Sequence, residues 1–357
     1  MNRTYLDWNA TAPLRPEARA AMLAAMDVVG NPSSVHAEGR AAKSLVEKAR
    51  AQVAAAVGCN VSEVVFTSGA TEAARVLENR PAGCDVMVQD TAHDCLWSHF
   101  DLSNEDGAGG HTLAMGLANS ETGVITEPPA RDAEGLLPYG ARKANYLLLD
   151  AVQAVGKIPF AFSWSGADLA IVSAHKFGGP KGVGALIVKQ GLDITSLAVG
   201  GGQEMGRRSG TENIIGIAGF GAAAEAAQRD LEVGIPDQVE KLRNILENTL
   251  AAEANKTIFV GKDARRIPNT SCFITPGWKG ETQVMQMDLA GFAISAGSAC
   301  SSGKVKESRV LRAMGYDADQ ARSAVRVSLG PTTTEDDVLR FAEAWLKAWS
   351  RHQARAA

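Results

Sequence analysis

The sequence predicts an α/β protein, with a large domain built on a mainly parallel sheet and a smaller α/β domain toward the C-terminus. Short apolar strands at residues 146–150 and 169–172 run directly into turns that carry polar side chains. This arrangement is typical of open α/β sheets that bind a ligand at the carboxyl ends of their strands. Such strands alternate with helical stretches along the chain. The 357 residues, 45% of them hydrophobic, are enough for two domains and a large core.

The elements of the first third follow from local patterns. Residues 4–13 are predicted as a short strand or extended arm. Residues 17–28 and 37–57 are predicted as helices because apolar residues recur at helical spacing, and Gly58 ends the second one. Residues 127–145 are weakly patterned and predict a loop followed by a short helix. Segments in which a strand leads into a turn are predicted at residues 64–72, 85–89 and 113–117.

The remaining elements complete the large domain and form the smaller one. Two apolar strands, at residues 169–172 and 183–188, enclose a turn rich in glycine and proline. Helices are predicted at residues 214–231 and 238–252, and we place the change of domain near the start of the second. The predicted boundaries are 15–230 for the large domain, and 1–14 with 231–357 for the small domain.

Composition and charge exclude several classes of protein. The formal net charge of −4 argues against a nucleic-acid binder, which presents a basic face. No apolar run reaches membrane-spanning length and the N-terminal residues contain no apolar signal core, so we expect a cytoplasmic protein. The five cysteines are odd in number and scattered, which suits a reducing compartment. The six histidines show no metal-ligand spacing, so no metal site is expected.

Lys176 and Asp150 are the first candidate functional residues. Lys176 follows an apolar strand and precedes a tight turn, and a lysine in a partly apolar position loses its proton easily and condenses with carbonyl groups. Asp150 stands at the carboxyl end of an earlier strand, three residues before Gln153. A pyridoxal 5′-phosphate (PLP) site requires such a pair, because the lysine bonds the aldehyde and the acid keeps the ring nitrogen protonated. The alternatives are a solvated loop lysine and a helix N-cap.

Two segments have the composition of anion-binding loops. Residues 64–72 read as a strand, a turn of small residues and a helix start, where backbone N–H groups and the Thr71 hydroxyl bind phosphate well. A plain capped helix is the alternative. Residues 200–213 contain several glycines, two arginines and a threonine, which offer backbone donors and positive charge to an anion. They lack the spacing of a Walker A loop.

Three further residues have side chains suited to catalysis or substrate binding. His93 lies beyond a strand end, where it can cover an aromatic cofactor and move protons, although a lone histidine is more often structural. Cys300 is the one thiol in a run of small residues, 295–303, for which a linker with an incidental cysteine is the alternative. Arg326 lies among apolar residues, so its charge needs either a substrate carboxylate or a structural Asp or Glu.

Taken in order, these segments resemble the cysteine desulfurase family, the NifS/IscS-like branch of the class V aminotransferases. The resemblance covers nearly the whole chain, and its most specific motifs are SAHKFGGPKG at residues 173–182 and GSAC at residues 297–300. The others include YLDWNATAP, GNPSSVH, VVFTSGATE, GGGQEMGRRSGTEN and VRVSLG. The resemblance implies a PLP-dependent enzyme of fold type I that forms a homodimer.

The resemblance also implies a role for each matching residue. Lys176 would hold PLP, Asp150 would pair with its ring nitrogen and Gln153 would bond its ring oxygen. His93 would stack on the ring and shuttle protons, and Cys300 would accept sulfur as a persulfide. The other cofactor contacts would come from Ala70, Thr71, Asn119, Ser120, Ser173 and His175, with Thr211 reaching in from the second subunit. Arg326 and Asn31 would bind the substrate.

The implied reaction converts L-cysteine to L-alanine, and the sulfur passes to Fe–S cluster assembly or to another acceptor protein. A selenocysteine lyase or another class V aminotransferase is the nearest alternative enzyme. A weakly active scaffold that binds Fe–S assembly proteins is the alternative of a different class. The thiol in its loop of small residues favours sulfur transfer. The presence together of Lys176, Asp150, Cys300 and Arg326 favours an enzyme over a scaffold.

The sequence departs from the family pattern in three places. Ser120 stands where a second asparagine that touches PLP is usual, and Met205 replaces a usual arginine. The spans from Thr71 to His93 and from His93 to Asn119 are shorter than in relatives, so part of the large domain is expected to be trimmed. Such trimming leaves an exposed patch or a partner protein over the gap.

Overall fold

The computed structural model describes residues 3–78, 84–103, 110–296 and 307–356. The chain forms two compact units, and each is described by itself. The large unit consists of Pro13–Leu117 and Thr126–Leu231, and the small unit of Met1–Ala12, Ala118–Ile125 and Glu232–Ala357. The small unit therefore includes residues 118–125, which the sequence prediction places in the large domain. Backbone hydrogen bonds from Ile267 N to Gly123 O and from Ile125 N to Arg265 O, both 2.8 Å, fasten this segment to the small unit.

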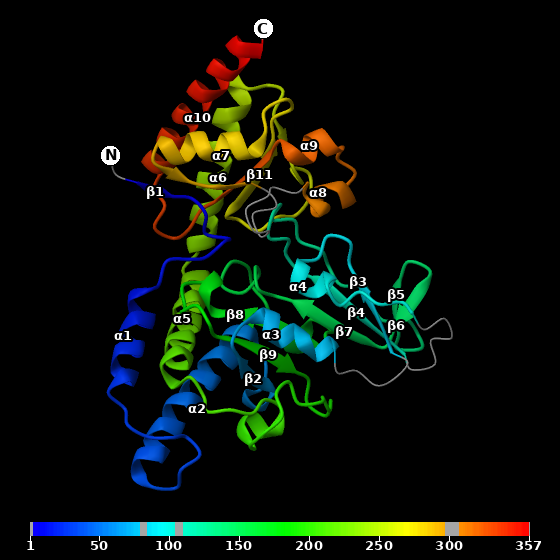
Figure 1. Ribbon diagram of the computed structural model, residues 1–357, viewed down its shortest axis with the longest axis vertical. Helices are drawn as coiled ribbons and strands as arrows, with labels where there is room; N and C mark the ends of the chain where they lie inside the picture. Colours follow the sequence, from blue (N-terminus) through cyan, green and yellow to red (C-terminus); the bar gives the residue numbers. More distant parts are fainter. Residues whose placement is uncertain (1–2, 79–83, 104–109, 297–306, 357) are drawn as a thin grey trace. The chain divides into compact units, whose positions relative to one another are not determined.

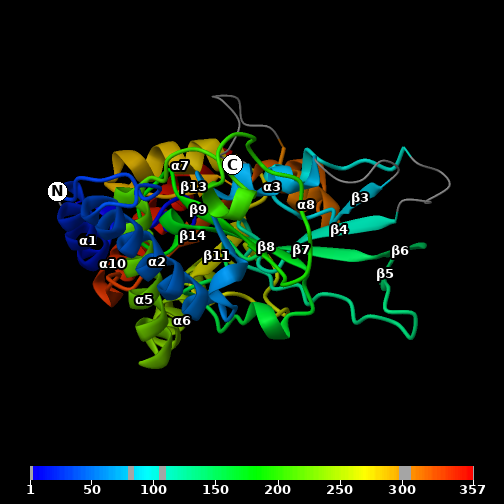
Figure 2. The same cartoon turned by 90° about the horizontal axis from the view of Figure 1, so that it is seen from below.

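A six-stranded sheet organises the large unit, in the order β2-β9-β8-β7-β4-β3. Neighbours from β3 to β8 are parallel, and β9 is antiparallel to both β8 and β2, so five strands point the same way. Every residue of β8 and β9 is buried, as expected of a sheet that is covered on both faces. The strands are β2 (Val64–Thr67), β3 (Asp85–Val88), β4 (His111–Gly116), β7 (Tyr146–Asp150), β8 (Leu169–Ser173) and β9 (Gly184–Val188). Figure 2 shows β3, β4 and β7 side by side.

Helix α5 (Ile214–Glu232) packs closely against α1 (Pro16–Met26) and α2 (Ala37–Val57) because glycines line its contact face (Figure 1). A Cβ at Gly219 would lie 2.6 Å from Met22, and one at Gly221 would lie 2.6 Å from Ala49. The helix α2 ends at Gly58, which has a left-handed φ of 64°. Among its described residues this unit also has the short α-helices α3 (Ala70–Ala74) and α4 (Asp94–Trp97).

The prediction of a short helix within residues 127–145 is wrong. Two strands, β5 (Leu137–Tyr139) and β6 (Arg142–Ala144), form an antiparallel hairpin there. Gly140 begins the two-residue turn with a φ of 58°, which suits glycine at the first position of a hairpin turn. Strands of three residues are too short to show a clear alternation of apolar and polar residues, so the periodic pattern gave no signal.

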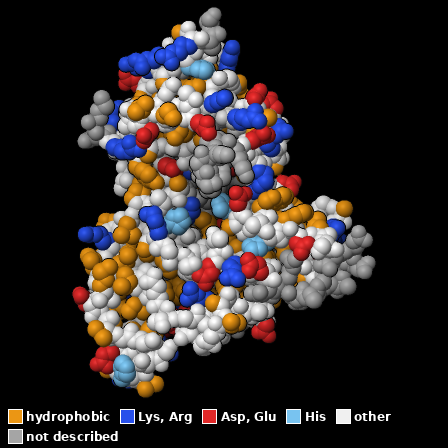
Figure 3. Space-filling view, in the orientation of Figure 1, with side chains coloured by type: hydrophobic (Ala, Val, Ile, Leu, Met, Phe, Trp, Pro, Cys, Tyr) orange, Lys and Arg blue, Asp and Glu red, His pale blue; other side chains and the backbone are white. Residues whose placement is uncertain are grey.

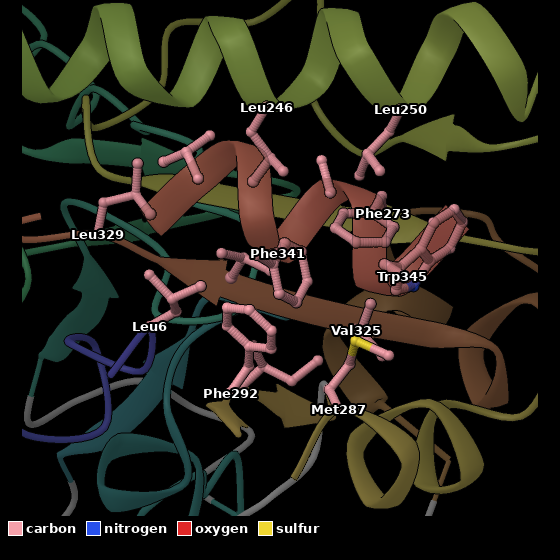
Figure 4. Packing of buried hydrophobic residues seen from close by; sticks show 14 of the residues in the cluster. Leu6, Leu246, Leu250, Phe273, Met287, Phe292, Val325, Leu329, Phe341 and Trp345 are labelled. Atoms are coloured by element: carbon pink, nitrogen blue, oxygen red, sulfur yellow. The ribbon is translucent and has the colours of Figure 1, made fainter. Parts of the chain in front are cut away.

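The small unit is a four-stranded antiparallel sheet covered by helices, in the order β10-β11-β14-β13. Helices α6 (Ile235–Glu253) and α10 (Glu335–Ala356) lie side by side (Figure 1). Leu246 and Leu250 of α6 and Phe341 and Trp345 of α10 meet Phe273 of the sheet in one buried cluster (Figure 4). The strands are β10 (Ile258–Phe259), β11 (Thr270–Ile274), β13 (Ser295–Ala296) and β14 (Ala324–Ser328), with a separate parallel pair, β1 (Thr4–Tyr5) and β12 (Phe292–Ala293).

The other α-helices in the described part of the small unit are α7 (Gly280–Leu289), α8 (Arg309–Ala313) and α9 (Ala318–Arg322). Among the described residues, no helix combines the length and the apolar character that crossing a membrane requires.

Candidate active site

Most of the predicted cofactor residues follow strands that end at one edge of the large unit's sheet. Since β2, β3, β7 and β8 point the same way, the residues after them share that edge. The residues that the sheet brings to this edge are Ala70 and Thr71 after β2, His93 after β3, Asp150 at the end of β7, and Ser173, His175 and Lys176 at the end of β8.

Asp150 is the buried acid of this edge. Its side chain is 9% exposed, and Oδ1 accepts a hydrogen bond from the backbone N–H of Val152 at 2.9 Å. Burial raises the pKa of Asp150, while the nearby charges of His93 and Lys176 and the Val152 bond lower it in part. His93 and Lys176 thus both contribute to the electrostatic environment of this carboxylate. A buried carboxylate in this position is suited to a cationic ring nitrogen.

His93 is oriented by the helix that it begins. It is the N-cap of α4, and its Nδ1 accepts the backbone N–H of Cys95 at 3.1 Å. Because Nδ1 is an acceptor, the proton of the neutral imidazole is on Nε2. The Cys95 thiol also bonds His93, and burial, with a further contribution from Asp150, raises the pKa of that thiol. Cys95 was not predicted, although its position two residues after His93 was a signal.

His175 and its cationic neighbours define the electrostatics beside Lys176. Burial first, and then the charges of Lys176, Lys181 and Lys157, lower the pKa of His175 to about 4. His175 is therefore neutral near pH 7. Lys157 is only 9% exposed, and its Nζ donates to Oε1 of Gln153, which is 3% exposed. Lys157 was also not predicted, and the signal for it was its place four residues after Gln153.

The loop before α3 has the geometry of a phosphate site. A Cβ built on Gly69 would have no atom within 4 Å, so this loop borders open space. Gly69 caps α3 and has no side chain to accept the first N–H groups of the helix. Glu72 accepts the backbone N–H of Ser68 at 2.7 Å and Nε of Arg208 at 2.9 Å. These bonds hold the loop against residues 200–213, the second predicted anion-binding segment.

Arg326 lies in β14 of the small unit and is 6% exposed. Its Nη2 bonds Oδ1 of Asp7 at 2.7 Å and its Nη1 donates to the carbonyl oxygen of Ser120 at 2.9 Å. Nε is buried and has no hydrogen-bond partner among the described residues. The structural acid considered for Arg326 is thus present as Asp7, and the guanidinium retains donors for a substrate carboxylate.

Asn119 and Ser120 belong to the small unit, and their polar groups form hydrogen bonds within it. Oδ1 of Asn119 accepts the backbone N–H groups of Glu121 and Thr122, both at 2.9 Å. The Ser120 carbonyl accepts Nδ2 of Asn9 at 3.1 Å as well as Nη1 of Arg326. In the described structure these residues therefore stabilise the 118–125 turn.

Asn31 and Thr211 do not follow strands that end at this edge. Asn31 and Thr211 are exposed, and Oδ1 of Asn31 accepts the backbone N–H of Ser33 at 2.9 Å. Within the described residues, neither side chain has a hydrogen bond to Asp150 or Lys176. Cys300 lies outside the described residues.

Comparison with known proteins adds independent support. The family described as Aminotransferase class-V matches residues 4–93 and 111–341. A cysteine desulfurase of Cereibacter sphaeroides is 37% identical, over 96% of this chain and 95% of its own. The cysteine desulfurase IscS of Dictyoglomus turgidum is 33% identical, over 94% of this chain and 91% of its own. The X-ray structure of a NifS-like protein from Rickettsia africae ESF-5 covers 98% of this chain and all of its own at 29% identity, with a TM-score of 0.84.

Because the family model matches most of the chain, this protein belongs to the class V aminotransferases. Within that class, the chain belongs to the cysteine desulfurase family, whose members named above align with it almost from end to end. The predicted family, enzyme class and α/β fold are thereby confirmed. The family is PLP-dependent, and the buried Asp150, the neighbouring Lys176 and the open Gly69 loop fit that cofactor.

Proposed function

We propose that this protein is a PLP-dependent cysteine desulfurase that converts L-cysteine to L-alanine and collects the sulfur as a persulfide on Cys300. The observation that supports the proposal most strongly is the grouping of Asp150, His93 and Lys176 at one sheet edge. Each residue comes from a different strand end, and each has a side chain that PLP chemistry uses.

PLP would be held by residues of the large unit. Lys176 would bond it, Asp150 would pair with its ring nitrogen, and the Gly69–Thr71 turn would receive its phosphate, together with Ser173 and His175. Since His175 is neutral, it serves there as a hydrogen-bond donor or acceptor and not as a cation. When bound, PLP supplies a ring that accepts electrons from the substrate carbon.

The chain's own groups would bind the substrate and move its protons. Arg326 would bind the carboxylate of cysteine, and the released Lys176 amine would take the proton from Cα. Nε2 of His93 would donate or accept a proton near the ring. The Cys300 thiolate would then bond the substrate Sγ as the Cβ–Sγ bond breaks, and Cβ would gain the proton that makes it the methyl group of alanine.

We also propose a homodimer that passes sulfur to an acceptor or Fe–S scaffold protein in the cytoplasm. Apolar side chains gather over α1 of the large unit (Figure 3), and the exposed ones include Leu23, Met26 and Val29. A second copy covering this surface would bury it. The exposed Asn31 and Thr211 are then available to complete a site in that copy.

The direct test is a product assay on the purified protein with PLP. L-cysteine should yield alanine and sulfur in equal amounts, while transamination of other amino acids should be far slower. Preference for selenocysteine would instead favour the lyase. Protein that binds no PLP and releases no sulfide would favour the scaffold.

Asp150→Asn is expected to stabilise the cofactor-free protein near pH 7 while weakening PLP binding. Burial raises the pKa of Asp150 above its unfolded value, so between the two pKa values the folded chain holds more protons than the unfolded chain. The free energy of unfolding therefore falls as the pH rises through this interval. The Asn side chain does not ionise, so the variant does not lose this stability. Urea denaturation of the cofactor-free proteins at pH 7 and at acidic pH measures the difference in free energy of unfolding between Asp150→Asn and the unaltered protein. This difference should become smaller on acidification.

Asp168→Asn is the matched control for that experiment. Asp168 is also buried in the large unit, but it is paired with Arg131 at 2.6 Å and Lys189 at 3.2 Å. Loss of its charge should destabilise the protein at pH 7. If both variants lost the same free energy of unfolding, the buried charge of Asp150 would not destabilise the folded protein.

Arg326→Lys is expected to raise KM for L-cysteine about tenfold or more, with a much smaller change in kcat. A hydrogen bond to a charged group contributes about 1.5–3 kcal/mol, and lysine lacks the planar fork that binds a carboxylate through two bonds. Steady-state kinetics over a range of cysteine concentrations measures the two constants separately.

Arg266→Lys controls for structural damage in the same unit. Arg266 is equally buried and makes two hydrogen bonds to Glu247, of 2.7 and 2.9 Å. Both variants should lose some stability, and only Arg326→Lys should change KM. An unchanged KM in Arg326→Lys would leave Arg326 as a purely structural partner of Asp7.

A further inference from the structure

Lys157 is a buried lysine beside the candidate cofactor site, and none of the roles above uses it. It lies on the turn that follows β7, four residues after Gln153, and its Nζ donates to Oε1 of Gln153. Both side chains are buried, with exposures of 9% and 3%. A lysine this buried is uncommon in proteins and needs a reason.

The chemistry of the contact fixes the orientation of the amide. An ammonium group has only donors, so the atom of Gln153 that faces Lys157 must be the amide oxygen. The amide NH₂ group therefore points away from Lys157. The bond to a positive charge also polarises the amide and makes its N–H groups stronger donors.

The turn that carries both residues is held firmly. Backbone N–H groups of Lys157 and Ile158 both bond the carbonyl of Ala154 at 3.0 Å. Gly156 has a φ of 75°, and a Cβ there would lie 2.9 Å from Ala227, so the turn packs closely against the rest of the unit. The charge of Lys157 also contributes to the lowered pKa of His175, the second residue after β8.

We propose that Lys157 is a positioning residue, which turns the Gln153 amide so that its N–H donates to the ring oxygen of bound PLP. The inference rests on the proposed function, because it assumes that PLP occupies the sheet edge. The donated bond and the nearby charge stabilise the negative ring oxygen. The hydrogen bond and the charge therefore lower the midpoint, which is the pH at which half of the change in the visible absorption of bound PLP has occurred.

The test compares the PLP-loaded protein with Lys157→Met and Lys181→Gln by titrating the visible absorption of the cofactor with pH. Both variants remove one positive charge that acts on His175, but Lys181 is exposed, whereas Lys157 contacts Gln153. Lys157→Met should raise the midpoint by about one pH unit and weaken PLP binding about tenfold. Lys181→Gln should leave the midpoint close to that of the unaltered protein.

Gln153→Glu supplies a second variant that does not depend on how Lys157→Met folds. The carboxylate still accepts from Lys157 but has no N–H for the ring oxygen, so the midpoint should rise here too. A shift of equal size in Lys157→Met and Lys181→Gln, or no shift in either Lys157→Met or Gln153→Glu, would overturn the inference. Failure of the unaltered protein to take up PLP would instead overturn the proposed function.

Discussion

Lys176→Ala is expected to abolish the visible absorption of bound PLP and to lower sulfide release from L-cysteine by at least about 10³-fold. In the proposed function Lys176 would bond the cofactor, and the same amine would take the proton from the substrate carbon. General acid–base catalysis alone contributes about 10²–10⁴-fold, and loss of the covalent bond adds to that. Absorption spectra of the purified variant with added PLP, together with a sulfide assay, measure both effects.

Lys181→Ala is the matched control for this experiment. It removes an exposed lysine from the same glycine-rich turn, five residues further along the chain. We expect it to keep both the absorption and the sulfide release. A Lys176→Ala protein that kept its visible absorption would show that another amine holds the cofactor. The grouping of Lys176 with Asp150 would then no longer support the proposed function.

Elements with strong local signals could be predicted from the sequence. Helix α2 begins and ends where the prediction placed it, at residues 37 and 57, because a long amphipathic pattern is followed by Gly58 in a left-handed conformation. Strands β7 and β8 were equally clear, since each contains a run of buried apolar residues. The hairpin at residues 137–144 was missed because its pairing is decided by one glycine turn and not by a periodic pattern.

The centre of the site could be predicted because strand direction is a simple rule. Once β3, β7 and β8 are taken as parallel, His93, Asp150 and Lys176 must share an edge. The helix N-cap considered as the alternative for Asp150 is not met, because residues 152–157 form a turn and not a helix, although Asp150 does accept the N–H of Val152. The carboxylate is therefore held in place by its own turn before any cofactor binds.

The supporting contacts could not be predicted, because they join distant parts of the chain or depend on burial. Arg326 meets Asp7 across 319 residues of sequence, and no local pattern marks that pair. The contact of Lys157 with Gln153 is local, but its meaning depends on both side chains being buried. Composition and spacing indicate which residues react, whereas the fold decides which residues orient them.

The four cysteines of the described structure are poor candidates for the sulfur-accepting thiol. A reactive thiol must ionise readily and be accessible. Burial raises the pKa of Cys59 to about 12, and burial also raises the pKa values of Cys95 and Cys272. Cys84 is buried beside β3. Cys300, in its run of small residues, is the remaining thiol of the sequence.

Cys300→Ala is therefore expected to keep the full visible absorption of bound PLP and to release almost no sulfide, a loss of at least about 10³-fold. The residues proposed to hold PLP lie at the sheet edge and are unchanged in this variant, whereas Cys59, Cys95 and Cys272 have raised pKa values and Cys84 is buried. Labelling with radioactive cysteine should also leave no sulfur on the variant. Cys59→Ala, which removes a thiol of raised pKa from the same chain, should label and turn over like the unaltered protein. Sulfide release by Cys300→Ala at an undiminished rate would mean that the sulfur leaves the substrate without passing through this thiol, and the persulfide would have to be removed from the proposed reaction.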